Sequence, residues 1–350
     1  MKQPSTPWAW VPSLYFAEGL PYVAVTLLSI EIYMQMGLSD AQITFYTSWL
    51  YMPWVIKPFW SPFLDLFKTK RWWIVAMELL LGAAFAGVLQ VIFRYQIRFS
   101  WGLIFYGLTG LFIAFYLYHN FVLPKPDEDV DHKTETAREV LNGFLETFAS
   151  FFRKKQIVIA ILFMLLFRLP EALLTPVSQL FLQAQPSRGG LGLSPQEFGL
   201  VNGTVGVIGL LAGGIIGGML ASRDGLKKWL WPMTAAITIP NVAYVYLAYF
   251  MPESLVAINV AVFLENFGYG FGFSAYMLFL IYFSQGEHKT SHYALCTGFM
   301  ALSMMLPGLF AGALAQAVGY RLFFVIVMIS CILPFIVAHQ LDIEEHFGKK

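Results

Sequence analysis

The residues with the chemical capacity for a function are ionisable side chains that stand inside long apolar segments. A charge at the centre of a bilayer costs about 3 kcal/mol or more, so such residues mark ion or substrate paths and proton relays. The candidates in chain order are Glu18, Lys57, Arg168, Glu171 and Glu265.

Arg168 and Glu171 are three residues apart, so on a helix they share one face and form an ion pair. Protonation of the carboxylate would remove one charge and change the pairing, which is the behaviour of a proton-coupling element. The alternative is a static ion pair that locks helices together. Pro176 lies downstream, and we expect the helix to kink there.

Glu265 and Asn266 stand in the middle of an apolar segment and are followed by Gly268, Gly270 and Gly272. Small residues allow helices to approach closely in membranes, so this polar pair must face the interior of a bundle. A functional role for both residues is favoured.

Glu18 and Lys57 each have two interpretations. Glu18 precedes Gly19 and Pro21, which weaken a helix as in the broken helices of transporter binding sites. It is either a proton or substrate site, or a carboxyl hydrogen-bonded near one membrane face. Lys57 lies between two prolines; it pairs with a carboxylate or a substrate anion, or it extends to the interface.

Glu31 and Glu78 also lie within apolar segments, and we expect them to be structural.

The composition places these residues in a membrane protein. Of 350 residues, 58% are hydrophobic and 12% are charged, whereas soluble domains carry about 25% charged residues. There is no phosphate-binding glycine loop and no Gly-x-Ser-x-Gly motif, and the two cysteines and six histidines lack metal spacing. We therefore expect no enzyme, no cofactor and no metal, and the net charge of +1 gives no argument for a nucleic-acid partner.

Ten segments have the length and apolarity of membrane spans. Their approximate limits are 10–35, 43–64, 72–94, 100–122, 156–183, 197–221, 229–250, 254–284, 291–317 and 320–340. With the N-terminus inside, the inner segments hold 16 Lys and Arg and the outer segments hold 4. Positive charge accumulates on the cytoplasmic side, so both termini are expected to be cytoplasmic.

The expected fold is an all-α integral membrane bundle of about ten transmembrane helices, four plus six, of the major-facilitator kind. The domains are a shortened bundle at 1–123, a cytoplasmic linker at 124–155 and a second bundle at 156–350. Within the linker, apolar residues at helical spacing predict an amphipathic helix over 134–152 on the inner membrane surface.

Several runs resemble one family. They are YFAEGLP at 15–21, PFWSPFLD at 58–65, LYHNFVLPKP at 117–126, GGMLASRDGLKK at 217–228 and FLENFGYGFGF at 263–273. In this order the runs are similar to the muropeptide permeases of the AmpG type, within the peptide–acetyl-coenzyme A branch of the major facilitators. The resemblance covers most of the chain, although no single run is diagnostic.

The resemblance implies a proton-driven permease of the bacterial inner membrane that imports an anhydromuropeptide released in cell-wall recycling. Its partners would be that solute, protons and the bilayer. Asp65, Lys68 and Arg71 match the family's cytoplasmic gate loop. The family has two further helices between its third and sixth, and this chain lacks them.

Two other functions stay open at this point. One is a major facilitator for another solute, such as a siderophore, an acyl-coenzyme A or a sugar. The other is a shortened membrane protein that does not transport. The sequence leaves the oligomeric state open.

Overall fold

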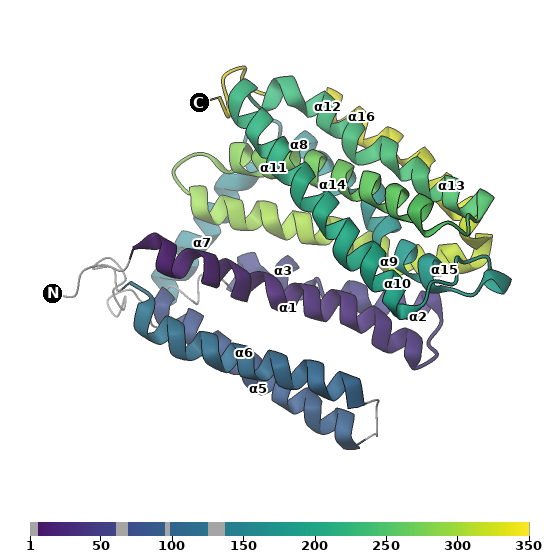
Figure 1. Cartoon of the computed structure of the whole chain (residues 1–350). Coiled ribbons are helices and arrows are strands. Elements are labelled where there is room, and N and C mark those ends of the chain that lie inside the picture. Colours follow the sequence, from purple (N-terminus) through teal and green to yellow (C-terminus); the bar gives the residue numbers. More distant parts are fainter. Residues whose placement is uncertain (1–5, 61–68, 95–98, 125–136, 350) are drawn as a thin grey trace. The chain divides into compact units, whose positions relative to one another are not determined.

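The structure, a computed structural model, describes residues 6–60, 69–94, 99–124 and 137–349. The described residues contain helices and no strands. Up to the linker the helices are α1 (Pro7–Gln35), α2 (Asp40–Trp49), α3 (Met52–Val55), α5 (Lys70–Arg94), α6 (Phe99–Val122) and α7 (Ala137–Phe152) (Figure 1).

The remaining elements follow the linker. They are α8 (Ile157–Leu166), α9 (Leu169–Gln183), η1 (Pro186–Arg188), α10 (Pro195–Phe198), the π-helix η2 (Gly199–Gly206), α11 (Val207–Asp224), α12 (Leu226–Thr238), η3 (Ile239–Asn241), α13 (Val242–Phe250), α14 (Leu255–Ser284), α15 (Lys289–Ser330) and α16 (Ile332–His339).

Each of the ten expected spans contains helix in its described part. Five of the spans are each built from consecutive pieces, namely α2 with α3, α8 with α9, α10 through α11, α12 with α13, and the end of α15 with α16. Two spans meet inside α15, where Gly319 adopts a φ of 77° that breaks the helix. A positive φ has no steric penalty for glycine, which explains why the boundary falls at this residue.

Seven helical stretches of the described chain are long and apolar enough to cross a membrane. They are Arg71–Val88, Gly102–Val122, Ile157–Gln183, Pro195–Asp224, Leu226–Phe250, Leu255–Ser284 and Lys289–His339. The last has 51 residues and contains Gly319, so it is long enough for two of the expected spans, since one needs about 20 residues. The all-α membrane bundle predicted from the sequence is confirmed.

The chain forms two compact units. The first consists of Met1–Ser29 and Phe59–Phe144. In it α5 and α6 lie side by side, and their contact contains the aromatic rings of Phe85, Phe105 and Phe112 (Figure 1). The second unit consists of Ile30–Pro58 and Leu145–Lys350. The bundle limits expected from the sequence stay a prediction.

Two apolar cores of the second unit surround the helices that carry the candidate site. One is built around Phe163, Tyr276 and Phe279, from α8 and α14. The other contains Phe181 and Phe324, from α9 and α15. The site described below lies where the α8–α9 segment meets α14.

The amphipathic helix expected at 134–152 is α7. Phe151 is fully buried in the first of these cores, whereas Leu145 and Phe152 are exposed. Lys154 follows the helix and donates hydrogen bonds to the backbone oxygens of Phe283 and Gln285 at 2.5 and 2.7 Å. Burial lowers the pKa of the Lys154 ammonium. The end of α7 is therefore fixed to α14.

Helices α11 and α14 approach each other closely through glycines. A Cβ atom placed on Gly213 would lie 2.1 Å from the backbone oxygen of Phe267, and one on Gly270 would lie 2.2 Å from that of Leu210. Gly268 and Gly272 contact α12 in the same way, 2.1 and 2.5 Å from backbone oxygens. The close approach predicted for the glycines of 263–273 is confirmed.

This contact predicts unequal effects of two substitutions in one helix. Gly213→Ala should lower the free energy of unfolding by about 1–3 kcal/mol, because the added methyl group overpacks against backbone. Gly218→Ala on the same helix has no atom within 4 Å of the added carbon, and should be neutral or raise that free energy by up to about 1 kcal/mol. Thermal unfolding of both variants in detergent checks this. Equal shifts in the unfolding midpoint would contradict the close contact.

Candidate functional site

The site begins at a break between α8 and α9. The helix ends at Leu166 and starts again at Leu169, with Pro170 in the first turn of the new helix. A proline has no N–H to donate and is favoured in a first turn, where that donor would have no helical acceptor. The helix α9 continues through Pro176, and the kink expected there stays a prediction.

Arg168 lies at this break and forms a bidentate ion pair with Glu171. The Arg168 Nε donates to one carboxylate oxygen at 3.1 Å, and an NH2 nitrogen donates to the other at 2.8 Å. Arg168 is 6% exposed and Glu171 is 5% exposed. Parallel N–H···O bonds of this kind are stronger than single ones and fix the geometry of both groups. The pair expected from the three-residue spacing is present.

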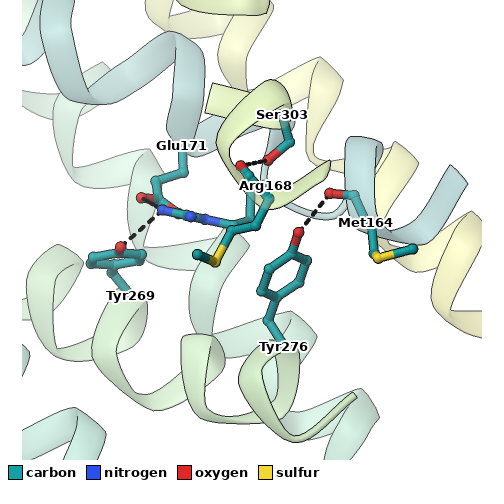
Figure 2. A network of polar contacts seen from close by, with 7 residues as sticks. Met164, Arg168, Glu171, Tyr269, Tyr276 and Ser303 are labelled. Carbon is teal, nitrogen blue, oxygen red and sulfur yellow. Dashed lines mark hydrogen bonds and ion pairs between the residues drawn. The ribbon is translucent and has the colours of Figure 1, made fainter. Parts of the chain in front are cut away.

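Aromatic residues of α14 complete the surroundings of Arg168. The same NH2 nitrogen donates to the Tyr269 hydroxyl at 2.9 Å. The guanidinium carbon lies 4.8 Å from the ring centre of Phe273 and 5.8 Å from that of Tyr276. Such cation–π contacts stabilise a desolvated cation by about 2 kcal/mol. Figure 2 shows the Arg168 guanidinium beside Glu171, with Tyr269 and Tyr276 of α14 near it.

A backbone carbonyl in the last turn of α8 accepts its hydrogen bond from a side chain of another helix. Terminal carbonyls of a helix lack intrahelical partners, and the Met164 oxygen accepts a hydrogen bond from the Tyr276 hydroxyl at 2.7 Å (Figure 2). Met164 and Tyr276 are both buried. Ser303 of α15 lies beside them and donates to the Met300 oxygen at 2.7 Å. The helix break is thus held by side chains of α14, which keep Arg168 in place.

Glu265 and Asn266 lie one turn before Tyr269 on α14. The Asn266 amide donates to Glu265 at 2.9 Å and to the Val262 backbone oxygen at 3.0 Å. A Cβ on Gly206, the last residue of η2, would lie 3.3 Å from that amide nitrogen. Glu265 is linked to the ion pair through Tyr269 on the same helix, whose hydroxyl accepts from Arg168. A π-helix is rare and occurs mostly at functional sites. The position of η2 beside Asn266 therefore favours a functional role for Glu265 and Asn266.

The arrangement combines the buried cation of Arg168 with a buried carboxylate, Glu171, and a half-buried one, Glu265. The two guanidinium nitrogens of Arg168 that form the Arg168 fork both donate to Glu171. An anionic group that bound Arg168 would therefore compete with the Glu171 carboxylate. A proton on Glu171 would weaken the ion pair and release the fork. The geometry is therefore suited to exchange between a proton and an anion, and α8, α9 and α14 position its parts.

The other predicted site residues lie apart from this cluster or outside the described residues. Lys57 belongs to the same unit and is exposed, and Glu18 is exposed in the other unit. Arg71 donates to the backbone oxygens of Leu123, at 3.4 Å, and Asn120. Asp65 and Lys68 lie outside the described residues. The structure thus brings together four of the predicted residues, namely Arg168, Glu171, Glu265 and Asn266.

One polar cluster was missed by the sequence reasoning. His119 contacts Ser13 through Nε2 at 2.9 Å and Glu78 through Nδ1. The three residues lie on α6, α1 and α5 of the first unit, 41 or more positions apart. The available signal was a polar residue on each of three apolar segments, which does not reveal that they meet.

The amino-acid sequence is similar to those of several bacterial transporters. No family model matches the chain. The anhydromuropeptide permease of Escherichia coli strain K12 is 21% identical over 377 residues, which cover 89% of this chain and 74% of the permease. The putative transporter AmpG 2 of Rickettsia prowazekii is 24% identical over 191 residues, which cover 55% of this chain and 45% of that protein.

This chain is related to the AmpG-type transporters. The putative transporter AmpG 4 of Rickettsia conorii agrees, with 26% identity over 189 residues, or 54% of this chain and 44% of that protein. The resemblance drawn from the sequence is confirmed, and the chain matches less than half of the length of these Rickettsia relatives. The chain is thus a multi-pass membrane protein whose relatives are named as transporters and permeases, and those names agree with the expectation that it is not an enzyme.

The comparison with the E. coli permease also bears on length. The alignment has 377 positions, whereas this chain has 350 residues in total. The permease must therefore contain residues that have no counterpart here. This agrees with a chain that has fewer helices than the family, and the position of the difference stays a prediction.

The buried ion pair predicts a large loss of stability when one partner is removed. Glu171→Leu should lower the free energy of unfolding by about 3–5 kcal/mol, because Arg168 would stay buried without a counter-charge. The double variant Arg168→Met with Glu171→Leu should recover most of this loss. Thermal unfolding in detergent is the measurement.

A matched control is the exposed pair of Lys227 and Glu345, whose side chains are 50% and 74% exposed. Glu345→Gln should leave the unfolding midpoint almost unchanged, since surface pairs contribute little. If Glu171→Leu were as mild as this control, the ion pair would not hold the α8–α9 break.

Proposed function

We propose that the chain is a proton-coupled secondary transporter of the major-facilitator kind. Its substrate would be an anhydromuropeptide or a similar solute, imported across the bacterial inner membrane by alternating access, with both termini in the cytoplasm. Support comes from the helical bundle, from the AmpG-type relatives and from the excess of Lys and Arg in the segments expected inside.

The observation that carries this proposal is the ion pair of Arg168 and Glu171 beside Glu265. A buried charge network is weak evidence for stability alone, because well-packed apolar residues serve as well or better. Ionisable groups inside a membrane protein are by default assigned to a transport path. In this proposal a proton on Glu171 or Glu265 frees the Arg168 fork, and an acidic group of the solute takes it.

Alternating access requires a contact that can open at one end of the bundle. The segment Ile30–Pro58 packs against α15, where the Thr44 hydroxyl accepts a hydrogen bond from the Gly312 N–H at 3.0 Å. Nearby, the Tyr320 hydroxyl donates to Asp40 at 2.7 Å. A cavity of about 450 Å³ is lined by Asp40, Arg188 and Tyr320. These residues lie at the end expected outside, so we assign this contact as the outer gate.

Transport is tested by uptake of labelled anhydromuropeptide into vesicles with and without a proton gradient. Gradient-driven uptake is expected for the wild type. The triple variant Glu18→Gln, Glu171→Gln and Glu265→Gln should lose the stimulation by the gradient, because an amide carries no transferable proton. Intact coupling in the triple variant would contradict the roles given to these carboxylates.

Competition in the same assay separates the candidate solutes. Inhibition by unlabelled anhydromuropeptide, and not by a siderophore, an acyl-coenzyme A or a simple sugar, would support the assignment. No uptake of any of them by folded protein would favour a shortened chain that does not transport.

The outer gate predicts a change in accessibility. Ser48 is buried beside Gly308, so a cysteine placed there should react slowly with a membrane-impermeant maleimide. Tyr320→Phe removes the hydrogen bond to Asp40, which contributes about 1 kcal/mol and corresponds to roughly a fivefold shift toward the open state. The labelling rate of Ser48→Cys should rise by a similar factor.

The background is low in this experiment because Cys296 and Cys331 are buried. The matched control is Tyr246→Phe, which changes an exposed tyrosine in the same unit. An equal labelling rate for Ser48→Cys with either tyrosine substitution would contradict the assignment of Asp40 and Tyr320 to a gate.

A further inference from the structure

The cluster of Ser13, Glu78 and His119 has a geometry that determines where its protons are. His119 is fully buried and Glu78 is 5% exposed. The Ser13 hydroxyl donates to the Trp10 backbone oxygen at 3.0 Å, so its single hydrogen is used there. The 2.9 Å contact between Ser13 and His119 Nε2 then requires a hydrogen on Nε2.

The other side of the imidazole faces Glu78 Oε1. Since Nε2 is protonated, the contact at Nδ1 needs one more proton between Nδ1 and Oε1. That proton lies either on the carboxyl, with a neutral imidazole, or on Nδ1, with a carboxylate. In both cases the pair of Glu78 and His119 is neutral overall, which suits an apolar interior.

Loss of one proton can be accommodated without breaking either contact. The Nε2 proton leaves, Nδ1 keeps its proton and donates to the Glu78 carboxylate, and the Ser13 hydroxyl turns from Trp10 to donate to Nε2. The cluster then holds one proton fewer and carries one negative charge. Glu78 Oε2 is buried and has no hydrogen-bond partner in the described part of the chain, so this charged form is the more costly of the two.

We propose that Ser13, His119 and Glu78 form a proton-binding site of the first unit, separate from the Arg168 cluster. The site takes up one proton on His119 Nε2, and the Ser13 hydroxyl reverses its direction when the proton leaves. Only its use in transport depends on the proposed function; the site itself is defined by the three contacts.

The surroundings contain few other charges. Three helices supply the cluster, and their ionisable side chains in the described part of this unit are Tyr15, Glu18, Arg71, Tyr106, Tyr116 and Tyr118. Glu18 is exposed, and Arg71 is held by backbone oxygens beyond His119. Tyr118 donates to the Ala9 backbone oxygen and thereby holds α6 on α1. No arginine or lysine among these side chains forms an ion pair with Glu78, so His119 is its partner.

The test is nitrogen NMR of the protein in lipid nanodiscs with ¹⁵N-labelled histidine, between mildly acidic and mildly basic pH. The imidazole shifts report which ring nitrogen is protonated. The signal of His119 among the six histidines is assigned by its loss in His119→Gln. We expect Nε2 to be protonated at low pH and Nδ1 alone to be protonated at high pH.

Two variants isolate the proposed contacts. Ser13→Ala should abolish the change to the Nδ1 form, because no donor then replaces the Nε2 hydrogen. Glu78→Gln should abolish it as well, because an amide has no proton to lose and no charge to hold a proton on Nδ1, whereas the exposed Glu146→Gln should leave it unchanged. If His119 kept one protonated nitrogen throughout, or titrated alike in all variants, the cluster would be a static structural contact and the proposal would be wrong.

Uptake by the same variants gives a separate result. A proton switch without uptake of any solute would contradict the proposed function and leave the proton site standing. Gradient-driven uptake with a His119 that keeps one protonation state would support the proposed function and contradict the proton site.

Discussion

The rest of this structure depends on one constraint, which is that a charge among apolar helices must find its partner within the chain. Arg168 meets it through two hydrogen bonds to Glu171, one to Tyr269 and the rings of α14. Those contacts exist because α8 and α9 break beside α14, and the break is possible because Pro170 needs no hydrogen-bond acceptor. The element boundary and the polar site are therefore two results of the same local sequence.

Close packing around α14 also helps to keep the buried charges next to their partners. The backbone approach at Gly213 and Gly270 brings α11 to α14 without large side chains between them. The opposite glycines, Gly268 and Gly272, bring α12 to its other side. A helix fixed on two sides holds Tyr269 and Glu265 in a defined position, and a charge network needs such rigidity because misaligned buried hydrogen bonds are costly.

Much of this could be predicted from the sequence, because the bilayer imposes a length and a polarity that hydropathy records directly. The ten spans, the pair of Arg168 and Glu171 and the close approach at Gly270 all follow from local spacing. The contact of α2 with α15 and the cluster around His119 could not be predicted, because their partners are distant in sequence; Thr44 and Gly312 are 268 positions apart.

The account's central claim is that this short bundle moves a solute by alternating access, and counterflow tests it without any gradient. Liposomes containing the protein would be loaded with unlabelled anhydromuropeptide and diluted into a trace of the labelled compound. A transient accumulation of label above that of empty liposomes is the predicted result. Folded protein that gives no accumulation with this or any competing solute would contradict the claim.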